Sequence, residues 1–343
     1  YYIENGMGVK WKWLAKMFAF FGAGVGLLGI GTFTQVNGIS SAVCNFFDPD
    51  KVNTIALFGR DYSIATIIAG LALTVCVGLV VIGGLKRIAS VSQVVVPFMA
   101  IIYFVFAFIV IVTHITALPA AIVTIVKSAF TGSALAGGAA GTMVVAMQKG
   151  IARGIFSNEA GLGSAPIAAA AAQTHSTVRQ GLVSMTGTFI DTIVICTMTG
   201  LTIVITGTWN TGLEGVAITT AAFQKGLPFP SAVASLVLMV CLVFFAFTTI
   251  LGWNYYGERC IEYLFNRNKK VVKGYRWLYI LAIFIGPYMT VEAVWNIADI
   301  FNALMAFPNL IALIALSPVV FAETKAFFGK QKAKVKSAEV QAN

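Results

Sequence analysis

A polar, glycine-rich segment interrupts otherwise apolar sequence at residues 153–166, which read RGIFSNEAGLGSAP. Asn158 and Glu159 carry groups that are costly inside a bilayer, since a charged side chain at its centre costs about 2.5–3.5 kcal/mol. Gly161 and Gly163 supply the backbone freedom that breaks a helix. Helices broken at mid-membrane and flanked by hydroxyl and carboxamide groups are how secondary transporters build substrate and ion sites. The segment therefore predicts a transporter with a hinge at these two glycines.

Candidate cation ligands occur in this segment and elsewhere in the apolar sequence. Asp191 stands alone in an apolar run, and intramembrane carboxylates are functional candidates by default. The alternatives for Asp191 are a structural pair with Arg153 or a hydrogen bond to the broken helix. Because hard cations prefer oxygen ligands, Ser157, Asn158 and Thr248 complete the candidate set.

Three other side chains suit a small amphiphilic ligand. Thr249 and Trp253 are four residues apart and share a helix face, which places a hydroxyl beside an indole. Trp253 is alternatively an aromatic residue of the membrane interface. Gln35 offers a neutral carboxamide that either orients a polar substrate or bonds a neighbouring helix. Asp299 and Asn302 form a second polar interruption, which suits helix pairing or a gate.

Composition places these residues in a membrane protein. The chain of 343 residues is 58% hydrophobic and 10% charged, whereas a soluble domain carries about 25% charged residues. Apolar runs long enough to span a bilayer number about eight, at 14–47, 63–83, 93–118, 150–174, 182–207, 231–256, 277–294 and 299–321. The first run is too long for one helix, so part of it tilts or continues outside. The sequence predicts an all-α polytopic membrane protein with a transporter domain at 1–324 and a basic cytoplasmic tail at 325–343.

The net charge of +10 does not indicate nucleic-acid binding, because the basic residues lie in short segments between apolar runs without interleaved aromatics. Most of the 23 basic residues fall at the two ends and in alternate connections, near 10–16, 86–87, 179, 259–276 and 325–336. The positive-inside rule then places both ends in the cytoplasm. We expect a multi-pass protein of the plasma membrane. The five cysteines lack CxxC spacing, so no metal site is expected beyond a sodium site.

With these residues in hand, the chain resembles the alanine/glycine:cation symporter family. The stretch 150–166 is close to the signature of that family and is highly specific. Supporting matches are residues 1–6, the segment around Gln35, residues 249–253 and residues 297–310. The resemblance implies an inverted-repeat LeuT-type fold that moves small neutral amino acids, typically alanine or glycine, with sodium as the coupling ion and no other cofactor.

The resemblance also implies which residues touch the substrate. Gln35 matches the glutamine that contacts the amino acid, and Phe156, Ala160, Thr249 and Trp253 match the positions that enclose its side chain. Sodium would bind near the broken helices and raise the affinity for the amino acid before the helices rock. Members of the family have further spans before the point where this chain starts, including another broken helix. We therefore expect an N-terminal truncation that holds only part of the site and does not transport alone.

Other functions are also considered. A LeuT-type transporter for a different small solute is the nearest alternative, and an ion channel is the next, although no ring-forming repeat or carbonyl filter motif occurs. A membrane enzyme is disfavoured because HExxH, GxSxG and paired catalytic carboxylates are absent from the sequence. The GxGxxG pattern at 24–29 lies in an apolar run without a βαβ context and is interpreted as close helix packing. Alanine or glycine, sodium or proton, and the oligomeric state stay open.

Overall fold

The structure is a computed structural model that describes residues 1–57, 59–130, 139–213 and 215–342. The described residues are mostly helical. In chain order the helical segments are α1 (Tyr2–Met7), η1 (Val9–Trp11), α2 (Lys12–Leu28), α3 (Phe33–Phe47), α4 (Ile64–Ile82), α5 (Gly84–Thr113), η2 (Ile115–Ala117), α6 (Leu118–Phe130), α8 (Ala139–Asn158), α9 (Ser164–Ala169), α10 (Thr177–Phe189), η3 (Ile190–Cys196), α11 (Thr197–Thr206), η4 (Thr208–Asn210), α12 (Val216–Gly226), α13 (Ser231–Leu264), α14 (Lys269–Ile285), η5 (Gly286–Tyr288) and α15 (Val291–Ala342). Strands β1 (Thr54–Leu57) and β2 (Arg60–Ser63) pair antiparallel.

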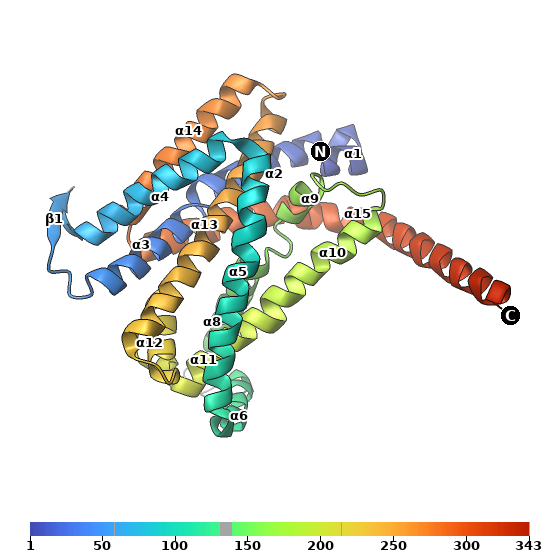
Figure 1. Ribbon diagram of the computed structural model, residues 1–343. Coiled ribbons are helices and arrows are strands. Elements are labelled where there is room, and N and C mark those ends of the chain that lie inside the picture. Colours follow the sequence, from blue (N-terminus) through green and yellow to red (C-terminus); the bar gives the residue numbers. More distant parts are fainter. Residues whose placement is uncertain (58, 131–138, 214, 343) are drawn as a thin grey trace.

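Helix α13 lies at the centre of the arrangement and contacts α2, α3 and α5 (Figure 1). The hairpin projects at one edge, and the end of α15 extends away from the other helices at the opposite edge (Figure 1). Trp253 of α13 and Tyr279 of α14 are among the largest side chains that are almost completely buried, and both belong to the main apolar cluster. The burial of these residues fixes α13 and α14 against α2.

Among the described residues, six helical stretches are long and apolar enough to cross a membrane, at Val9–Phe47, Ile64–Ile82, Gly84–Thr113, Thr177–Thr206, Ser231–Leu264 and Val291–Gln331. The chain is therefore a multi-pass helical membrane protein. The sequence-based count of eight spans is not confirmed.

The predicted run at 14–47 proves to be an interrupted helix. Helix α2 ends at Leu28 and α3 begins at Phe33, so the excess length is divided between two helices that meet at a break. At this break the chain passes close to α13, because a Cβ on Gly31 would lie only 2.4 Å from the Cβ of Trp253. Glycine is therefore required there for the close approach.

Side chains satisfy the backbone groups that the break leaves without helical partners. Thr32 Oγ1 donates a hydrogen bond of 2.5 Å to the carbonyl of Gly26. The hydroxyl of Tyr279 donates to the carbonyl of Gly31 at 2.9 Å. The break is consequently held both from within its own segment and from α14.

Asp299 does not interrupt a helix, because α15 continues through this residue, but the expectation that it pairs across helices is confirmed by its ion pair with Arg153 of α8. The chain turns earlier, where Gly286 and Pro287 form the short segment η5 between α14 and α15. Pro287 lacks the N–H of a helical hydrogen bond, and the backbone is extended at Met289 (φ −87°, ψ +151°), where the chain leaves η5. Helix α15 also continues through the predicted tail as far as Ala342.

Candidate functional site

The glycine-rich segment breaks the helix between α8 and α9, where residues 159–163 are not helical. Backbone φ is +57° at Glu159, +80° at Gly161 and +88° at Gly163, all in the left-handed region that favours glycine. A Cβ on Gly163 would also lie 2.6 Å from the ring of Phe18. Both space and backbone conformation therefore require glycine at this position. The break is shorter than the polar segment, because α8 continues into it.

A buried amide from α15 supports the break. Asn309 Nδ2 donates a hydrogen bond of 2.8 Å to the carbonyl of Gly161. The hydroxyl of Tyr2 donates to Asn309 Oδ1. This chain of contacts connects α1, α15 and the break, and Asn309 is only 2% exposed. Nothing in the sequence pattern distinguished Asn309 from the other polar residues of its apolar run.

The carboxylate of Glu159 joins the break to the central helix. Trp253 Nε1 of α13 donates a hydrogen bond of 3.0 Å to Glu159 Oε1. Ser164 Oγ, at the start of α9, donates to Glu159 Oε2 at 2.5 Å. Glu159 stood out in the sequence as a charge in apolar surroundings, but its connection with Trp253 was not foreseen, because the two residues are far apart in the chain.

Three of the four predicted cation ligands are brought together. Ser157 Oγ donates a hydrogen bond of 2.7 Å to Asp191 Oδ2. Asn158 Nδ2 donates to Thr192 Oγ1 at 3.0 Å. Ser157 Oγ is also 3.2 Å from the sulfur of Cys196. The end of α8 and the segment after α10 thus form one polar cluster of hydroxyl, amide and carboxylate groups, which we call the Asp191 cluster (Ser157, Asn158, Asp191 and Thr192).

Thr248, the fourth predicted cation ligand, has different contacts. Its hydroxyl donates to the carbonyls of Phe244 and Phe245 in its own helix, each at 3.0 Å. Back-bonding of this kind satisfies a threonine hydroxyl inside an apolar helix. The described contacts therefore place Thr248 in the packing of α13 and not in the Asp191 cluster.

Asp191 lies in a seven-residue π-helical segment, η3, between α10 and α11. Such segments are rare and occur frequently at functional sites. The sequence predicted an ordinary span at 182–207, since its apolar periodicity does not reveal a change in helix type.

Arg153 pairs with Asp299, so the alternative pairing of Arg153 with Asp191 is wrong. Arg153 Nη2 lies 2.8 Å from Asp299 Oδ1 and 2.5 Å from Oδ2. The same guanidinium lies 4.2 Å from the ring centroid of Trp295 and 5.7 Å from that of Phe156. The pair connects α8 with α15, and Arg153 precedes the break by six residues in the chain. The two aromatic faces add cation–π contacts.

Two of the predicted substrate residues are held by neighbouring backbone. Gln35 Nε2 donates to the carbonyl of Ile30 at 3.1 Å, which places Gln35 at the α2–α3 break. Thr249 Oγ1 donates to the carbonyl of Phe245 at 2.9 Å, one turn before Trp253 on the same helix. Gln35 therefore lies at the break whose Gly31 approaches Trp253, and Thr249 lies on the same helix as Trp253.

The other predicted substrate residues on the α8–α9 segment are Phe156, in the last turn of α8, and Ala160, in the break. Phe156 packs on Trp295 with 4.7 Å between ring centroids. Ala160 lies inside the break, where its N–H donates to Asn158 Oδ1 at 2.9 Å. Trp253 reaches the same segment through Glu159, so Phe156, Ala160 and Trp253 all border the break.

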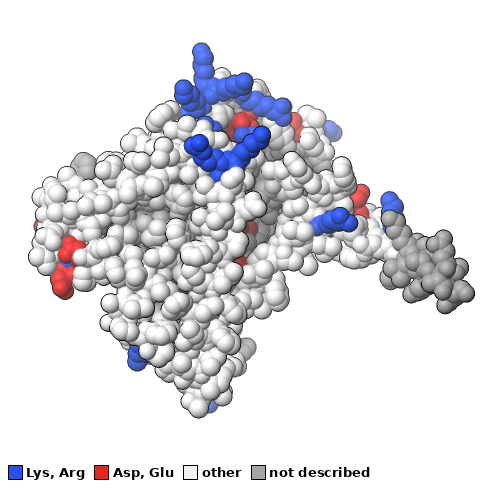
Figure 2. All heavy atoms as spheres, in the orientation of Figure 1, with Lys and Arg blue, Asp and Glu red and all other residues white. Residues whose placement is uncertain are grey.

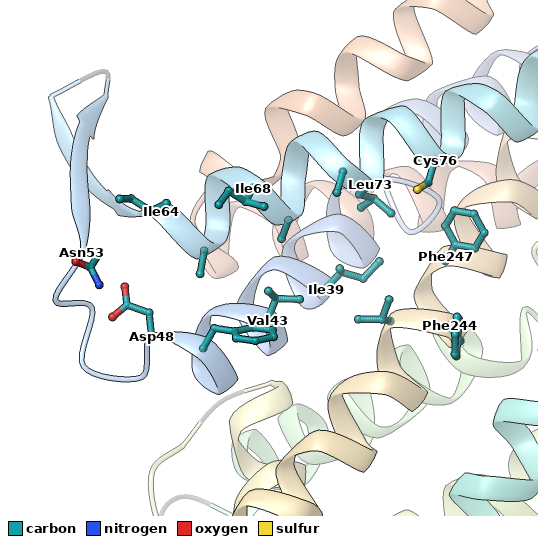
Figure 3. Close-up of a pocket in the computed structure, with 15 residues that line it drawn as sticks. Ile39, Val43, Asp48, Asn53, Ile64, Ile68, Leu73, Cys76, Phe244 and Phe247 are labelled. Carbon is teal, nitrogen blue, oxygen red and sulfur yellow. The ribbon is translucent and has the colours of Figure 1, made fainter.

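A large cavity of about 810 Å³ lies elsewhere, between α3, α4 and α13 (Figure 3). Its walls are apolar side chains such as Leu73 and Phe247, with Asp48 and Asn53 at one end (Figure 3). The carboxylate of Asp48 already accepts a hydrogen bond of 2.5 Å from Ser63. None of the predicted substrate or cation residues lines this cavity. It is therefore separate from the candidate site.

In the part of the chain that the structure describes, the helix is interrupted between α2 and α3 and between α8 and α9, and hydroxyl, amide and carboxylate groups gather at the second interruption. Secondary transporters use interruptions of this kind. The sequence model of the sodium:alanine symporter family matches residues 1–342, and the chain belongs to this family.

Relatives of the chain carry related descriptions. It is 50% identical to an uncharacterized transporter of Haemophilus influenzae, over 97% of this chain and 69% of the relative. It is 43% identical to the sodium/alanine symporter AgcS of Methanococcus maripaludis, over 98% of this chain and 70% of the relative. It is 37% identical to the probable sodium/glutamine symporter GlnT of Bacillus subtilis, over 97% of this chain and 65% of the relative. The chain thus spans about two thirds of the length of these relatives.

Proposed function

We propose that the protein carries a small neutral amino acid, alanine or glycine, together with sodium, and works by alternating access in a LeuT-type fold. Membership of the sodium:alanine symporter family supports this proposal. Relatives described as sodium symporters of alanine and of glutamine support sodium as the coupling ion. The two interrupted helices provide the discontinuities at which such transporters bind their substrates.

The observation that carries the proposal is the hydrogen bond between Trp253 and Glu159. Trp253 belongs to the central helix α13, whereas Glu159 begins the break after α8. A movement of the α8–α9 segment relative to α13 must change this contact. The residues that we propose to enclose the substrate side chain, Phe156, Ala160, Thr249 and Trp253, lie on the two elements that the bond joins. Gln35 at the second break is the proposed partner of the polar end of the amino acid.

The proposed enclosure limits the size of the substrate side chain. Aromatic walls from Phe156 and Trp253 would leave room for little more than a methyl group. One extra methylene in such a pocket changes the discrimination by about 1–3 kcal/mol. The transporter therefore prefers small side chains without excluding larger ones absolutely.

We propose sodium binding at the Asp191 cluster. Ser157, Asn158 and Asp191 contribute a hydroxyl, an amide and a carboxylate oxygen within one hydrogen-bonded group. Hard cations prefer such oxygen ligands, and a carboxylate offsets the ionic charge. Because the cluster includes the last turn of α8, an ion bound there would fix the helix immediately before the break and so favour one conformation.

We propose that the protein lies in the plasma membrane with both ends in the cytoplasm. The basic residues are concentrated at the two ends and in alternate connections of the sequence. This bias is the one that the positive-inside rule associates with the cytoplasmic side.

Uptake of labelled alanine by the natural full-length protein in proteoliposomes tests the function. Saturable uptake driven by an inward sodium gradient, and abolished when choline replaces sodium, is the expected result. Competition with a panel of glycine, leucine, glutamine and a purine then defines the substrate class. Non-saturable conductance would instead indicate a channel, and uptake insensitive to every amino acid would indicate another solute.

A further inference from the structure

A groove of about 460 Å³ lies where α4 and α13 end and α14 begins. Helices α4 and α13 are both long and apolar enough to span the membrane. Their shared end therefore lies near the surface of the bilayer, at the level of the lipid headgroups. Lys and Arg side chains are gathered at this end of the molecule (Figure 2).

Five basic and two acidic side chains line the groove, and two ion pairs neutralise both acids. Arg276 binds Glu258 through two hydrogen bonds of 2.7 and 2.8 Å. Arg259 lies 2.7 Å from Glu262. The Arg276–Glu258 pair connects α14 with α13, whereas Arg259 and Glu262 pair within α13. Together the two pairs leave the remaining basic groups without acidic partners in the groove.

The excess positive charge belongs to Arg267, Lys269 and Lys273. Within the part of the chain that the structure describes, no ion pair involves these three residues. Arg267 lies over the ring of Tyr1 at 5.8 Å, a contact that does not neutralise its charge. Lys269 and Lys273 are four residues apart on α14, so their exposed ammonium groups lie on the same side of the helix.

One wall of the groove is apolar and exposed. Trp277 and Ile82 both line the groove, and each is 55% exposed. Exposed tryptophans are typical of the interface between membrane and water, where the ring lies among headgroups. A cationic groove beside an apolar wall matches a ligand that has an anionic head and a hydrocarbon chain.

We propose that this groove binds an anionic phospholipid, whose phosphate contacts Lys269 and Lys273 and whose acyl chain lies along Trp277 and Ile82. A free phosphate ion shares the head chemistry but gains nothing from the apolar wall. The proposal does not depend on which solute the protein transports, because the groove includes neither the helix breaks nor the Asp191 cluster.

Quenching of tryptophan fluorescence by brominated lipids tests the proposal on the purified full-length protein in a neutral detergent. Brominated phosphatidylglycerol should quench at low lipid fraction, and brominated phosphatidylcholine should need a much higher one. The variant Trp277→Phe should remove the part of the quenching that is specific to phosphatidylglycerol, which assigns that part to the groove, because other exposed tryptophans such as Trp13 and Trp209 respond to both lipids alike. The double variant Lys269→Gln with Lys273→Gln should weaken phosphatidylglycerol binding roughly 25-fold, from about fivefold for each basic residue near an anionic surface.

The matched control removes two other exposed lysines at the N-terminal end, in the double variant Lys10→Gln with Lys16→Gln. This control should bind phosphatidylglycerol as the wild type does, and so should Lys269→Arg with Lys273→Arg. Equal weakening by both glutamine pairs would overturn the proposal in favour of general charge attraction. Equal quenching by the two lipids, or displacement of phosphatidylglycerol by millimolar inorganic phosphate, would also overturn it. Melting curves of each variant establish that it is folded.

Discussion

The indole of Trp253 donates its N–H to the carboxylate of Glu159, 94 positions earlier in the chain, at a distance of 3.0 Å. Trp253 is 1% exposed and packs on Tyr256, so its ring is fixed by α13. Glu159, in contrast, belongs to a segment with left-handed backbone and few helical bonds. A donor fixed on α13 thus holds an acceptor that belongs to the break, so the contact must change when the break changes shape relative to α13.

Replacement of Trp253 by phenylalanine removes the N–H and keeps most of the ring. Loss of the donor leaves a largely buried acceptor without this partner, which costs about 1–3 kcal/mol. We expect sodium-driven alanine uptake to fall at least tenfold, because Glu159 loses its anchor on α13. Kinetics of uptake in proteoliposomes measure the change, with Trp295→Phe as the control that alters a tryptophan of α15. Equal effects of the two substitutions would contradict a special role for the Trp253 contact.

Replacement of Trp253 by alanine enlarges the proposed enclosure. We expect leucine uptake to rise relative to alanine uptake, because the wall that rejects larger side chains is removed. Loss of so large a buried side chain also costs about 3–5 kcal/mol of stability, so melting temperature is measured in parallel. An unchanged ratio of alanine to leucine uptake in a folded variant would count against this wall.

Gly163→Ala tests the hinge. The new methyl group meets Phe18, and the left-handed conformation costs about 1–2 kcal/mol for a residue with a Cβ. We expect a lower melting temperature and reduced uptake. Gly154→Ala is the matched control, since its Cβ meets nothing within 4 Å and it lies inside α8. There the substitution should stabilise the protein by about 0.5–1 kcal/mol.

Asp191→Asn tests the cation site. Loss of the carboxylate charge should raise the sodium concentration for half-maximal alanine uptake about tenfold or more. Asp299→Asn is the control, because it removes a carboxylate that pairs with Arg153 outside the Asp191 cluster. That variant should lose stability without changing the sodium dependence. A parallel shift in both variants would indicate a general electrostatic effect.

Acid sensitivity is expected from Asp48, which follows α3. The hydroxyl of Ser63 lowers the pKa of this carboxyl, aided by the backbone N–H groups of Val52 and Asn53, and these bonds outweigh the opposing effect of burial. A carboxylate whose pKa is lower in the folded state stabilises the fold above its unfolded pKa, which is about 3.9 for aspartate. This contribution disappears as the pH falls through the lowered folded value.

Melting temperatures measured in detergent from neutral to acidic pH check this expectation. The wild type should lose more stability on acidification than Asp48→Asn, in which the titrating group is absent. Asp61→Asn changes an exposed aspartate of the β1–β2 hairpin, serves as the control and should follow the wild-type profile. Identical pH profiles for wild type and Asp48→Asn would show that this carboxylate does not couple to folding.

Local features of the sequence predicted the break after α8, because a charge, two glycines and an apolar helix former occur within a few residues. The first break, between Leu28 and Phe33, was visible only as a run too long for one helix. It is held by Tyr279, which comes from α14 and cannot be located by a local pattern. The helix breaks were therefore easier to predict from the sequence than the distant residues that contact them.

For the polar residues, too, the sequence indicated their chemistry but not the residues that they contact. Ser157, Asn158 and Asp191 were selected for their chemistry, and the fold brings them together. Thr248 has equivalent chemistry, but its hydroxyl bonds to its own helix. Asp299 was expected to pair across helices or to form a gate, and the fold pairs it with Arg153 from α8. Tertiary partners decided each outcome, and a single sequence does not reveal them.

Helix α15 has 52 residues, which corresponds to about 78 Å at the usual rise per residue. The hydrocarbon layer is only about 30 Å thick, so a large part of this helix projects from the membrane. A helix of that length amplifies small movements, because a tilt of a few degrees at its inner end moves its outer end by several ångströms. A fluorophore attached near the C-terminus would thus magnify small rearrangements around Asn309 into a distance change that spectroscopy can follow.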